Sequence, residues 1–170
     1  MSNTTWKEFG KNTLTHSGAH YLMAIQKIHE EQGYARLSDV AKSLKISKGS
    51  LSTSLKPLMR KKLIIEDENK HLFLSEIGQK FAKNIRNTYS VINHLFGKIL
   101  NVDAEIAEVD ACKIEHLLSE ESTGELLRMV KALETKPTLL KALKDEMHNY
   151  EKCSIKGCRT CSKNTFCLKD

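Results

Sequence analysis

Three features of the sequence predict a mainly α-helical protein. Apolar residues recur at helical spacing along most of the 170-residue chain. Only two short segments, 63–65 and 71–74, have the composition of β-strands. Hydrophobic residues make up 40% of the chain and charged residues 28%, with 8 glycines and 2 prolines. This composition excludes a disordered or collagen-like protein.

Three helices are predicted before the first strand. Residues 18–32 and 36–44 each place their apolar residues on one face. A third helix, 47–62, begins with Ser47, whose hydroxyl group makes it a good N-cap. Pro57 lies inside this helix and is expected to kink or shorten it, because proline has no backbone N–H.

A β-hairpin is predicted after the third helix. Its strands, 63–65 and 71–74, are separated by the polar turn 66–70. A tight turn at Lys45-Ile46 joins the second helix to the third. Three helices followed by a two-stranded ribbon form the outline of a winged helix-turn-helix, in which the third helix lies in the major groove of DNA.

The rest of the chain up to residue 150 is predicted to be helical. Residues 77–99 carry one apolar stripe over about six turns. A helix over 104–118 follows, and the capping box Ser-Thr-Gly-Glu opens another over 122–133. The last helix, 137–150, begins with a proline, which suits a first turn.

Charge is distributed unevenly along the chain, whose net charge is +6. Residues 36–62 carry a net charge of +7, whereas residues 101–135 carry −6. The basic segment favours a polyanion such as double-stranded DNA, although ordinary solvated helix faces are the alternative. Small hydroxyl side chains at the start of the third helix can bond phosphates or base edges. The predicted DNA-contacting residues are Arg36, Ser47, Lys48, Gly49, Ser50, Ser52, Thr53 and Lys56.

The sequence predicts a cytoplasmic protein without a membrane partner. Its N-terminus lacks the basic-then-apolar pattern of a signal peptide, and its longest apolar run, Tyr21 to Ile25, is too short to span a bilayer. An enzyme is not expected, because the sequence has neither a phosphate-binding loop nor a nucleophile–base motif.

A candidate metal site lies in the segment Cys112-Lys-Ile-Glu-His116. Its thiol, carboxyl and imidazole groups stand at positions i, i+3 and i+4, and on a helix they share one face. This combination suits a divalent transition metal better than Mg²⁺ or Ca²⁺. Glu108 lies one turn earlier on the same face and is a possible additional ligand.

Several motifs in the same order resemble the diphtheria-toxin-repressor/manganese-transport-regulator family of metal-dependent repressors. The resemblance covers about residues 14–133 and matches the short, two-domain branch of the family. Its motifs are Tyr34-Ala-Arg-Leu-Ser-Asp-Val-Ala41, Ser47-Lys-Gly-Ser-Leu-Ser52, His71-Leu-Phe-Leu-Ser-Glu-Ile-Gly78 and Cys112-Lys-Ile-Glu-His-Leu-Leu-Ser119.

The resemblance implies a homodimer with a divalent metal site, filled by Fe²⁺ or Mn²⁺. The implied ligands are His20, Cys112, Glu115 and His116. His16 lies one helical turn before His20 and is either a bystander or an extra ligand. Many family members hold a second metal at positions that align here with Tyr89, Asn93 and Glu108. Tyrosine and asparagine are poor ligands for a divalent cation, so this chain departs from the pattern there.

Four of the five cysteines crowd the end of the chain, at Cys153, Cys158, Cys161 and Cys167. In a reducing compartment such a cluster favours a metal centre over disulfides. The C-x4-C-x2-C spacing is that of plant-type [2Fe–2S] ferredoxins and is similar to that of small iron-transport-associated winged-helix proteins. Four thiolates also form a closed zinc site. We expect an iron–sulfur cluster, with Zn²⁺ as the alternative.

Together these features predict three parts and one leading function. The parts are a winged helix-turn-helix DNA-binding domain (1–75), a helical metal-binding and dimerisation domain (76–150) and a Cys-rich tail (151–170). The leading hypothesis is a repressor that binds DNA in response to iron or manganese, with an iron–sulfur cluster as a second input. The alternative is an iron–sulfur redox or cluster-carrier protein that uses its winged helix to dock onto other proteins.

Overall fold

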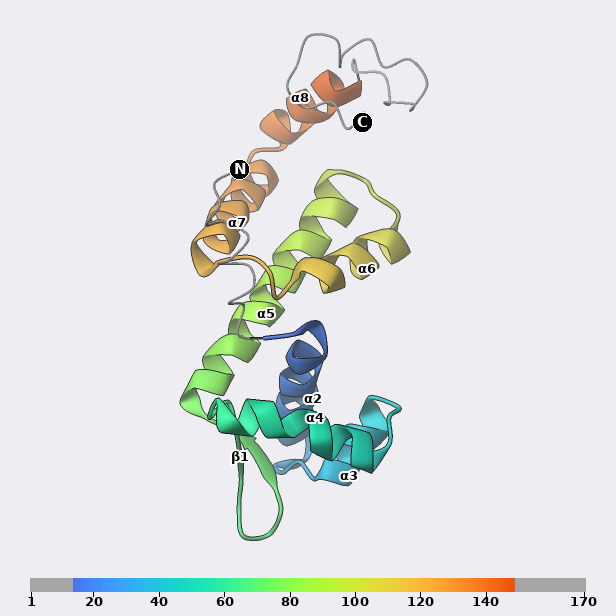
Figure 1. Ribbon diagram of the computed structural model, residues 1–170. Helices are drawn as coiled ribbons and strands as arrows, with labels where there is room; N and C mark the ends of the chain where they lie inside the picture. Colours follow the sequence, from blue (N-terminus) through green and yellow to red (C-terminus); the bar gives the residue numbers. More distant parts are fainter. Residues whose placement is uncertain (1–13, 149–170) are drawn as a thin grey trace, which may run out of the picture. The chain divides into compact units, whose positions relative to one another are not determined.

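The computed structural model describes residues 14–148 and confirms a mainly helical fold (Figure 1). The chain divides into two compact units, residues 1–130 and 131–170, with the division inside helix α7. The elements in chain order are α2 (His16–Gln32), α3 (Leu37–Ser43), α4 (Lys48–Arg60), β1 (Ile64–Glu66), β2 (Leu72–Leu74), α5 (Glu76–His94), the π-helical segment η1 (Leu95–Ile99), α6 (Ala104–Ile114), α7 (Glu120–Thr135) and α8 (Pro137–His148).

Side-chain caps set where several helices begin. The hydroxyl groups of Thr15, Ser47 and Ser75 accept hydrogen bonds from backbone N–H groups in the first turns of α2, α4 and α5. The first of these caps explains why α2 begins at His16, two residues before the predicted start. Gly33 ends α2 with φ = 82°, a left-handed conformation that favours glycine.

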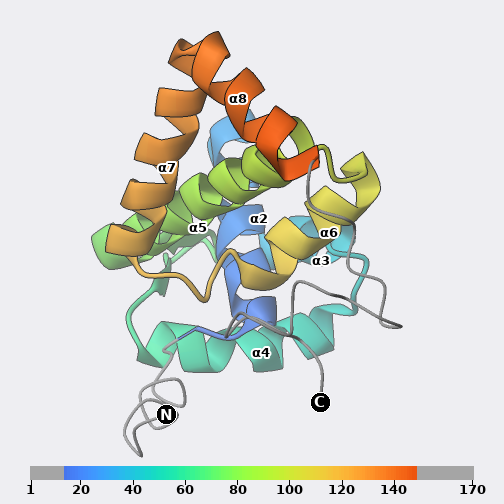
Figure 2. The same cartoon turned by 90° about the horizontal axis from the view of Figure 1, so that it is seen from above.

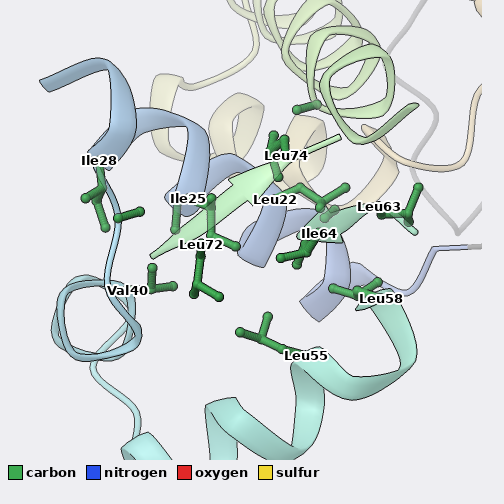
Figure 3. Close-up of a cluster of buried hydrophobic side chains, with 14 of the residues drawn as sticks. Leu22, Ile25, Ile28, Val40, Leu55, Leu58, Leu63, Ile64, Leu72 and Leu74 are labelled. Atoms are coloured by element: carbon green, nitrogen blue, oxygen red, sulfur yellow. The ribbon is translucent and has the colours of Figure 1, made fainter. Parts of the chain in front are cut away.

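Helices α2, α3 and α4 enclose one hydrophobic core with the β-hairpin. Figure 3 shows side chains from all four elements pointing toward one another. Leu22, Ile25, Leu51, Leu55 and Leu72 are at most 1% exposed. Truncating a leucine or isoleucine buried in this way to alanine costs about 2–5 kcal/mol, so this cluster holds the winged helix-turn-helix together.

The hairpin is the predicted wing. Strands β1 and β2 pair antiparallel, with Ile64 opposite Leu74. An isolated bridge between Arg36 and His71 adds a short third segment beside β2. Helix α4 continues through Pro57 as far as Arg60. The three helices and the hairpin therefore form the winged helix-turn-helix expected from the sequence.

Helix α5 connects the winged helix to the helices that follow. Its buried Ala82 and Ile85 belong to the winged-helix core, and its C-terminal half packs against α6 (Figures 1 and 2). Gly78, in its first turn, lies directly against the backbone carbonyl of Leu63, where a Cβ atom would collide with the oxygen. The Ser75 hydroxyl also donates a hydrogen bond to the Lys62 carbonyl, over 2.6 Å. The start of α5 is thus held closely against the base of the wing.

The structure corrects the predicted single helix over 77–99. The α-helix ends at His94, and a π-helical segment continues to Ile99, where the Leu100 N–H donates to the Leu95 carbonyl. The predicted apolar stripe also begins too early, because Ile77 is 53% exposed. A π-turn inserts one extra residue, and no single helical period can describe a stripe that crosses it.

Two further helix boundaries differ from those predicted. Helix α6 ends at Ile114, not at residue 118, and a turn follows it. Helix α7 begins at Glu120, before the predicted capping box at 122. Its cap is Ser119, whose hydroxyl accepts a hydrogen bond from the Ser122 N–H over 3.1 Å. A serine three residues before the predicted start therefore takes the capping role.

Among residues 14–148, no helix combines the length and the apolar character needed to cross a membrane.

Candidate metal centre

Three potential metal ligands meet where the first two turns of α2 face α6. His20 Nε2 lies 3.1 Å from His16 Nε2 and 3.3 Å from Cys112 Sγ, although His20 and Cys112 are 92 positions apart in the chain. One potential ligand atom from each of the three residues lies within 4.8 Å of the other two. The structure thus brings together two of the predicted ligands, His20 and Cys112, and adds His16.

Secondary structure explains why these side chains converge. His16 and His20 are four residues apart on α2, so they project from one face of the helix. Helix α5 packs against both α2 and α6, which holds Cys112 opposite that face. The position of the cluster therefore depends on the packing of three helices and not on a local loop.

The other two predicted ligands lie just beyond the end of α6. Glu115 is the C-cap residue, and its N–H donates to the Ala111 carbonyl. Its side chain is buried, with the residue only 6% exposed. The His116 ring centroid lies 5.2 Å from that of His16. His116 therefore borders the cluster through His16, although it is not among the three residues whose donor atoms gather most closely.

Burial favours the neutral form of two imidazoles, those of His20 and His116. It lowers the pKa of His20, and the neighbouring His16 adds to this effect. Burial also lowers the pKa of His116, with further contributions from His16 and His20. A neutral imidazole is the form that coordinates a metal, so these rings need lose no proton at neutral pH.

The acidic groups of the cluster show the opposite shift. Burial raises the pKa of Glu115 to about 7. Burial also raises the pKa of the Cys112 thiol, and the nearby carboxylates of Glu115 and Glu108 raise it further. These groups resist becoming negative next to one another, and a bound divalent cation would reverse that preference.

The donor set fits a divalent transition metal. A ring nitrogen has one proton or one lone pair, so His20 Nε2 can make a good hydrogen bond to only one of its two close neighbours. A cation can accept lone pairs from all three atoms at once. Imidazole and thiolate ligands favour transition metals over Mg²⁺ or Ca²⁺.

The positions aligned with a second family site lie in one surface pocket. Tyr89, Asn93 and Glu108 line it together with residues of η1. Burial raises the pKa of Tyr89, and Glu108 is the largest of the nearby charges that raise it further. The Tyr89 side chain is thus a neutral phenol at physiological pH, which is a weak ligand.

The structure places all eight predicted DNA-contacting residues at the surface. Three of them also have intramolecular roles. The Ser47 hydroxyl caps α4, and the Thr53 hydroxyl donates to the Gly49 carbonyl. Arg36 lies 5.3 Å over the Tyr34 ring and donates to His71 Nε2 over 3.4 Å, so its guanidinium is held beside the residue that precedes β2. The four tail cysteines lie outside the described residues.

A winged helix-turn-helix joined to a helical part through clustered imidazole and thiol groups defines a metal-dependent DNA-binding regulator. Residues 13–72 match the family described as "Iron dependent repressor, N-terminal DNA binding domain". Residues 75–149 match its partner, "Iron dependent repressor, metal binding and dimerisation domain". The chain belongs to this iron-dependent repressor family, as the resemblance predicted. It is a metal-dependent, DNA-binding transcriptional repressor and not an enzyme.

Individual relatives agree with this assignment. The HTH-type transcriptional regulator MntR of Bacillus pumilus is 30% identical over 142 residues, which cover 81% of this chain and 98% of the relative. MntR of Bacillus subtilis is 30% identical over 140 residues, covering 79% and 98%. The solved structure of the manganese regulator SloR superimposes with a TM-score of 0.59 at 21% identity, covering 66% of this chain and 53% of SloR. The chain thus spans nearly all of the MntR relatives and about half of SloR, whose likeness concerns the fold.

The raised pKa of Glu115 predicts how the stability of the metal-free protein depends on pH. Between the ordinary glutamate pKa of 4.5 and about 7, the folded protein keeps a proton that the unfolded chain loses, so stability falls as pH rises through this window. Glu115→Gln removes this penalty. We expect it to stabilise the chelated protein by on the order of 2 kcal/mol at pH 8 and by little at pH 4.5.

Urea unfolding of the chelated protein at both pH values measures this difference. Glu105→Gln alters an exposed carboxylate on α6, the helix that Glu115 follows, and is the matched control, for which we expect no such pH-dependent gain. Parallel stability profiles for Glu115→Gln and the parent protein would show that Glu115 titrates alike in the folded and unfolded states.

Proposed function

We propose that the protein is a homodimer that binds a double-stranded DNA operator in the cytoplasm when Fe²⁺ or Mn²⁺ is bound at His20, Cys112, Glu115 and His116. The observation that carries this proposal is the contact between His20 and Cys112. His20 comes from a helix that packs in the winged-helix core, and Cys112 comes from a helix in the part that follows. One ion held by both would link the DNA-reading part to the helical part.

The proposed coupling between metal binding and DNA binding runs from α2 to α4 through the winged-helix core. His20 lies on α2. The buried Leu22 and Ile25 of this helix pack in the same core as Leu51 and Leu55 of α4. Any constraint on α2 therefore reaches α4 through direct packing contacts. The ion would supply a cross-link between neutral imidazoles and ionised thiol and carboxyl groups. Limiting the motion of α2 against α6 would favour the arrangement that binds DNA.

The exposed face of α4 supports DNA as the ligand of the winged helix. Lys48, Ser52 and Lys56 are all exposed on this helix, while its Leu51, Leu55 and Leu58 are buried in the core. The helix thus has one face committed to packing and another, with basic and hydroxyl side chains, available to phosphates and base edges.

Exposed apolar side chains support dimerisation. A monomeric protein rarely leaves many large apolar residues in water on neighbouring helices, because burying them is favourable. Within residues 14–130, the helices after the wing and the turns beside them expose Leu100, Ile106, Val109, Leu117, Leu127 and Met129, each at 37% or more. A second copy of the chain would cover such residues, in keeping with the matched dimerisation domain.

Solved relatives support the choice of metals. SloR is described as a manganese regulator, and ScaR as a manganese-activated repressor that has also been crystallised with bound Zn²⁺. The matched family is named for iron dependence. These descriptions apply to those proteins, and they favour Fe²⁺ or Mn²⁺ as the first ions to test here.

The test of this function is DNA selection with and without metal. Genomic fragments are incubated anaerobically with the chelated protein, with Fe²⁺ or with Mn²⁺, and the retained fragments are sequenced. A repressor of this kind retains a few specific fragments only when metal is present. Equal, unselective retention in all three conditions would contradict the proposal and would favour the cluster-carrier alternative.

His116→Ala is expected to uncouple DNA binding from metal. In the parent protein we expect metal to strengthen binding to a selected fragment by about 5- to 150-fold, the usual range of allosteric coupling. Loss of one imidazole should reduce this ratio to near one while the dimer remains folded. Fluorescence anisotropy with a labelled fragment measures the ratio. His29→Ala, which removes an imidazole that contacts Phe73 edge to face in the winged helix, is the control and should behave like the parent.

Lys48→Glu is expected to weaken DNA binding without altering metal affinity. Replacing a cation near phosphate by an anion should cost about tenfold or more in affinity at moderate salt and should flatten the dependence on salt. Lys131→Glu makes the same charge change on an exposed part of α7, outside the matched DNA-binding domain, and should have little effect. Equal losses in the two variants would mean that net charge, and not α4, governs binding.

We propose that the tail cysteines hold one iron–sulfur cluster as a second, redox-sensitive input, with Zn²⁺ as the alternative. The support is the spacing of Cys153, Cys158, Cys161 and Cys167. Protein purified without oxygen should contain iron and acid-labile sulfide and absorb visible light. Changing any one of the four to serine should destabilise the cluster, whereas Cys112→Ser should not. One zinc per chain with no sulfide would replace the cluster by a structural site.

A further inference from the structure

His16 is the one member of the donor cluster that the implied ligand set does not contain. Its Nε2 atom lies 3.1 Å from His20 Nε2, and its ring centroid is 5.2 Å from that of His116. The donor atoms of His16, His20 and Cys112 all lie within 4.8 Å of one another. His16 is thus a full member of the donor cluster, which its position in the sequence alone does not show.

The local structure favours chelation by both α2 histidines. Two histidines four residues apart on a helix project from the same face, an arrangement that binds Zn²⁺ in other proteins. Thr15 caps the first turn of α2 through the Gly18 N–H, over 3.1 Å, and so holds the backbone of His16 in helical geometry. The two rings already stand edge to face, with centroids 4.5 Å apart.

We propose that His16 is an additional metal ligand and that it makes the site prefer Zn²⁺, Co²⁺ or Fe²⁺ over Mn²⁺. This inference rests on the proposed function, because it concerns the metal bound at the same site.

The composition of the enlarged ligand set is the reason for this preference. With His16 included, the side-chain donors are three imidazoles, one thiol and one carboxyl group. Imidazole and thiolate ligands suit zinc, iron and other later transition metals, whereas Mn²⁺ is better served by carboxylate, carbonyl and water oxygens. His16 would add one imidazole nitrogen, which raises the affinity for zinc, cobalt and iron more than the affinity for Mn²⁺.

A different role for His16 makes a different prediction. If His16 only orients His20 through a hydrogen bond, the loss of His16 should lower the affinity for every ion by a similar factor, because His20 is the ligand in each case. A ligand role changes the order of preference among ions. The ratio of Zn²⁺ affinity to Mn²⁺ affinity therefore distinguishes a ligand from a positioning residue.

The experiment uses the full chain, chelated and anaerobic, as parent, His16→Ala, His16→Asp and the control His29→Ala. Co²⁺ titrations followed by absorption report binding, and the part of the signal that disappears in Cys112→Ala identifies this site against any contribution from the tail. Competition with Zn²⁺ and with Mn²⁺ then gives both affinities. Circular dichroism verifies that each variant is folded.

We expect His16→Ala to lower Co²⁺ and Zn²⁺ affinity at this site by at least about tenfold, the loss that even an indirect partner of a metal can cause. Its Mn²⁺ affinity should change by less than about threefold. His16→Asp, which substitutes an oxygen donor, should shift the preference toward Mn²⁺. His29→Ala should match the parent in every measurement.

Two results would overturn the inference. One is an unchanged Zn²⁺ affinity in His16→Ala, and the other is an equal loss for Zn²⁺ and Mn²⁺. Both can occur while the parent still binds DNA in response to metal, which would leave the proposed function intact. Conversely, a parent that binds metal but never responds on DNA would contradict the proposed function and leave the role of His16 measurable.

Discussion

One helix, α2, must satisfy two demands at once, and the rest of the structure depends on that constraint. Its apolar face supplies Leu22 and Ile25 to the winged-helix core, where both are fully buried. Its first two turns supply His16 and His20 to the cluster at α6. A rotation of α2 by one residue, about 100°, would expose the first pair and misdirect the second. The packing of the core therefore also aims the ligands.

The cluster keeps groups that are unfavourable for the protein alone. A buried carboxyl group beside a thiol costs stability, and a well-packed apolar pair at Glu115 and Cys112 would not carry that cost. Departures from good local chemistry of this kind are characteristic of functional sites. The imidazoles of His16 and His20 lie on the α2 side of the cluster, and a bound cation would offset the repulsion between the ionised thiol and carboxyl groups.

Local signals in the sequence predicted most elements and the candidate ligands Cys112, Glu115 and His116, but not which side chains meet them from α2. Capping residues such as Ser47 and the helical spacing of apolar residues predicted the elements of the winged helix to within a few residues. The π-turn and the competing cap at Ser119 escaped prediction, because each depends on small differences between nearly equal local alternatives. The contact between His20 and Cys112 joins distant parts of the chain, so only the resemblance to a family indicated it. The pairing with His16 is visible as a four-residue spacing, yet its meaning required the fold.

The close contact between Gly78 and Leu63 means that α5 sets the distance between the wing and the helices that follow it. Because the base of the wing and the first turn of α5 leave no room between them, the wing cannot swing independently of that helix. The 19 residues of α5 span roughly 28 Å at the usual rise per residue. In a dimer paired through the helices beyond the wing, two such lengths would fix the separation of the reading heads. The length of α5 would then determine the spacing between the two operator half-sites.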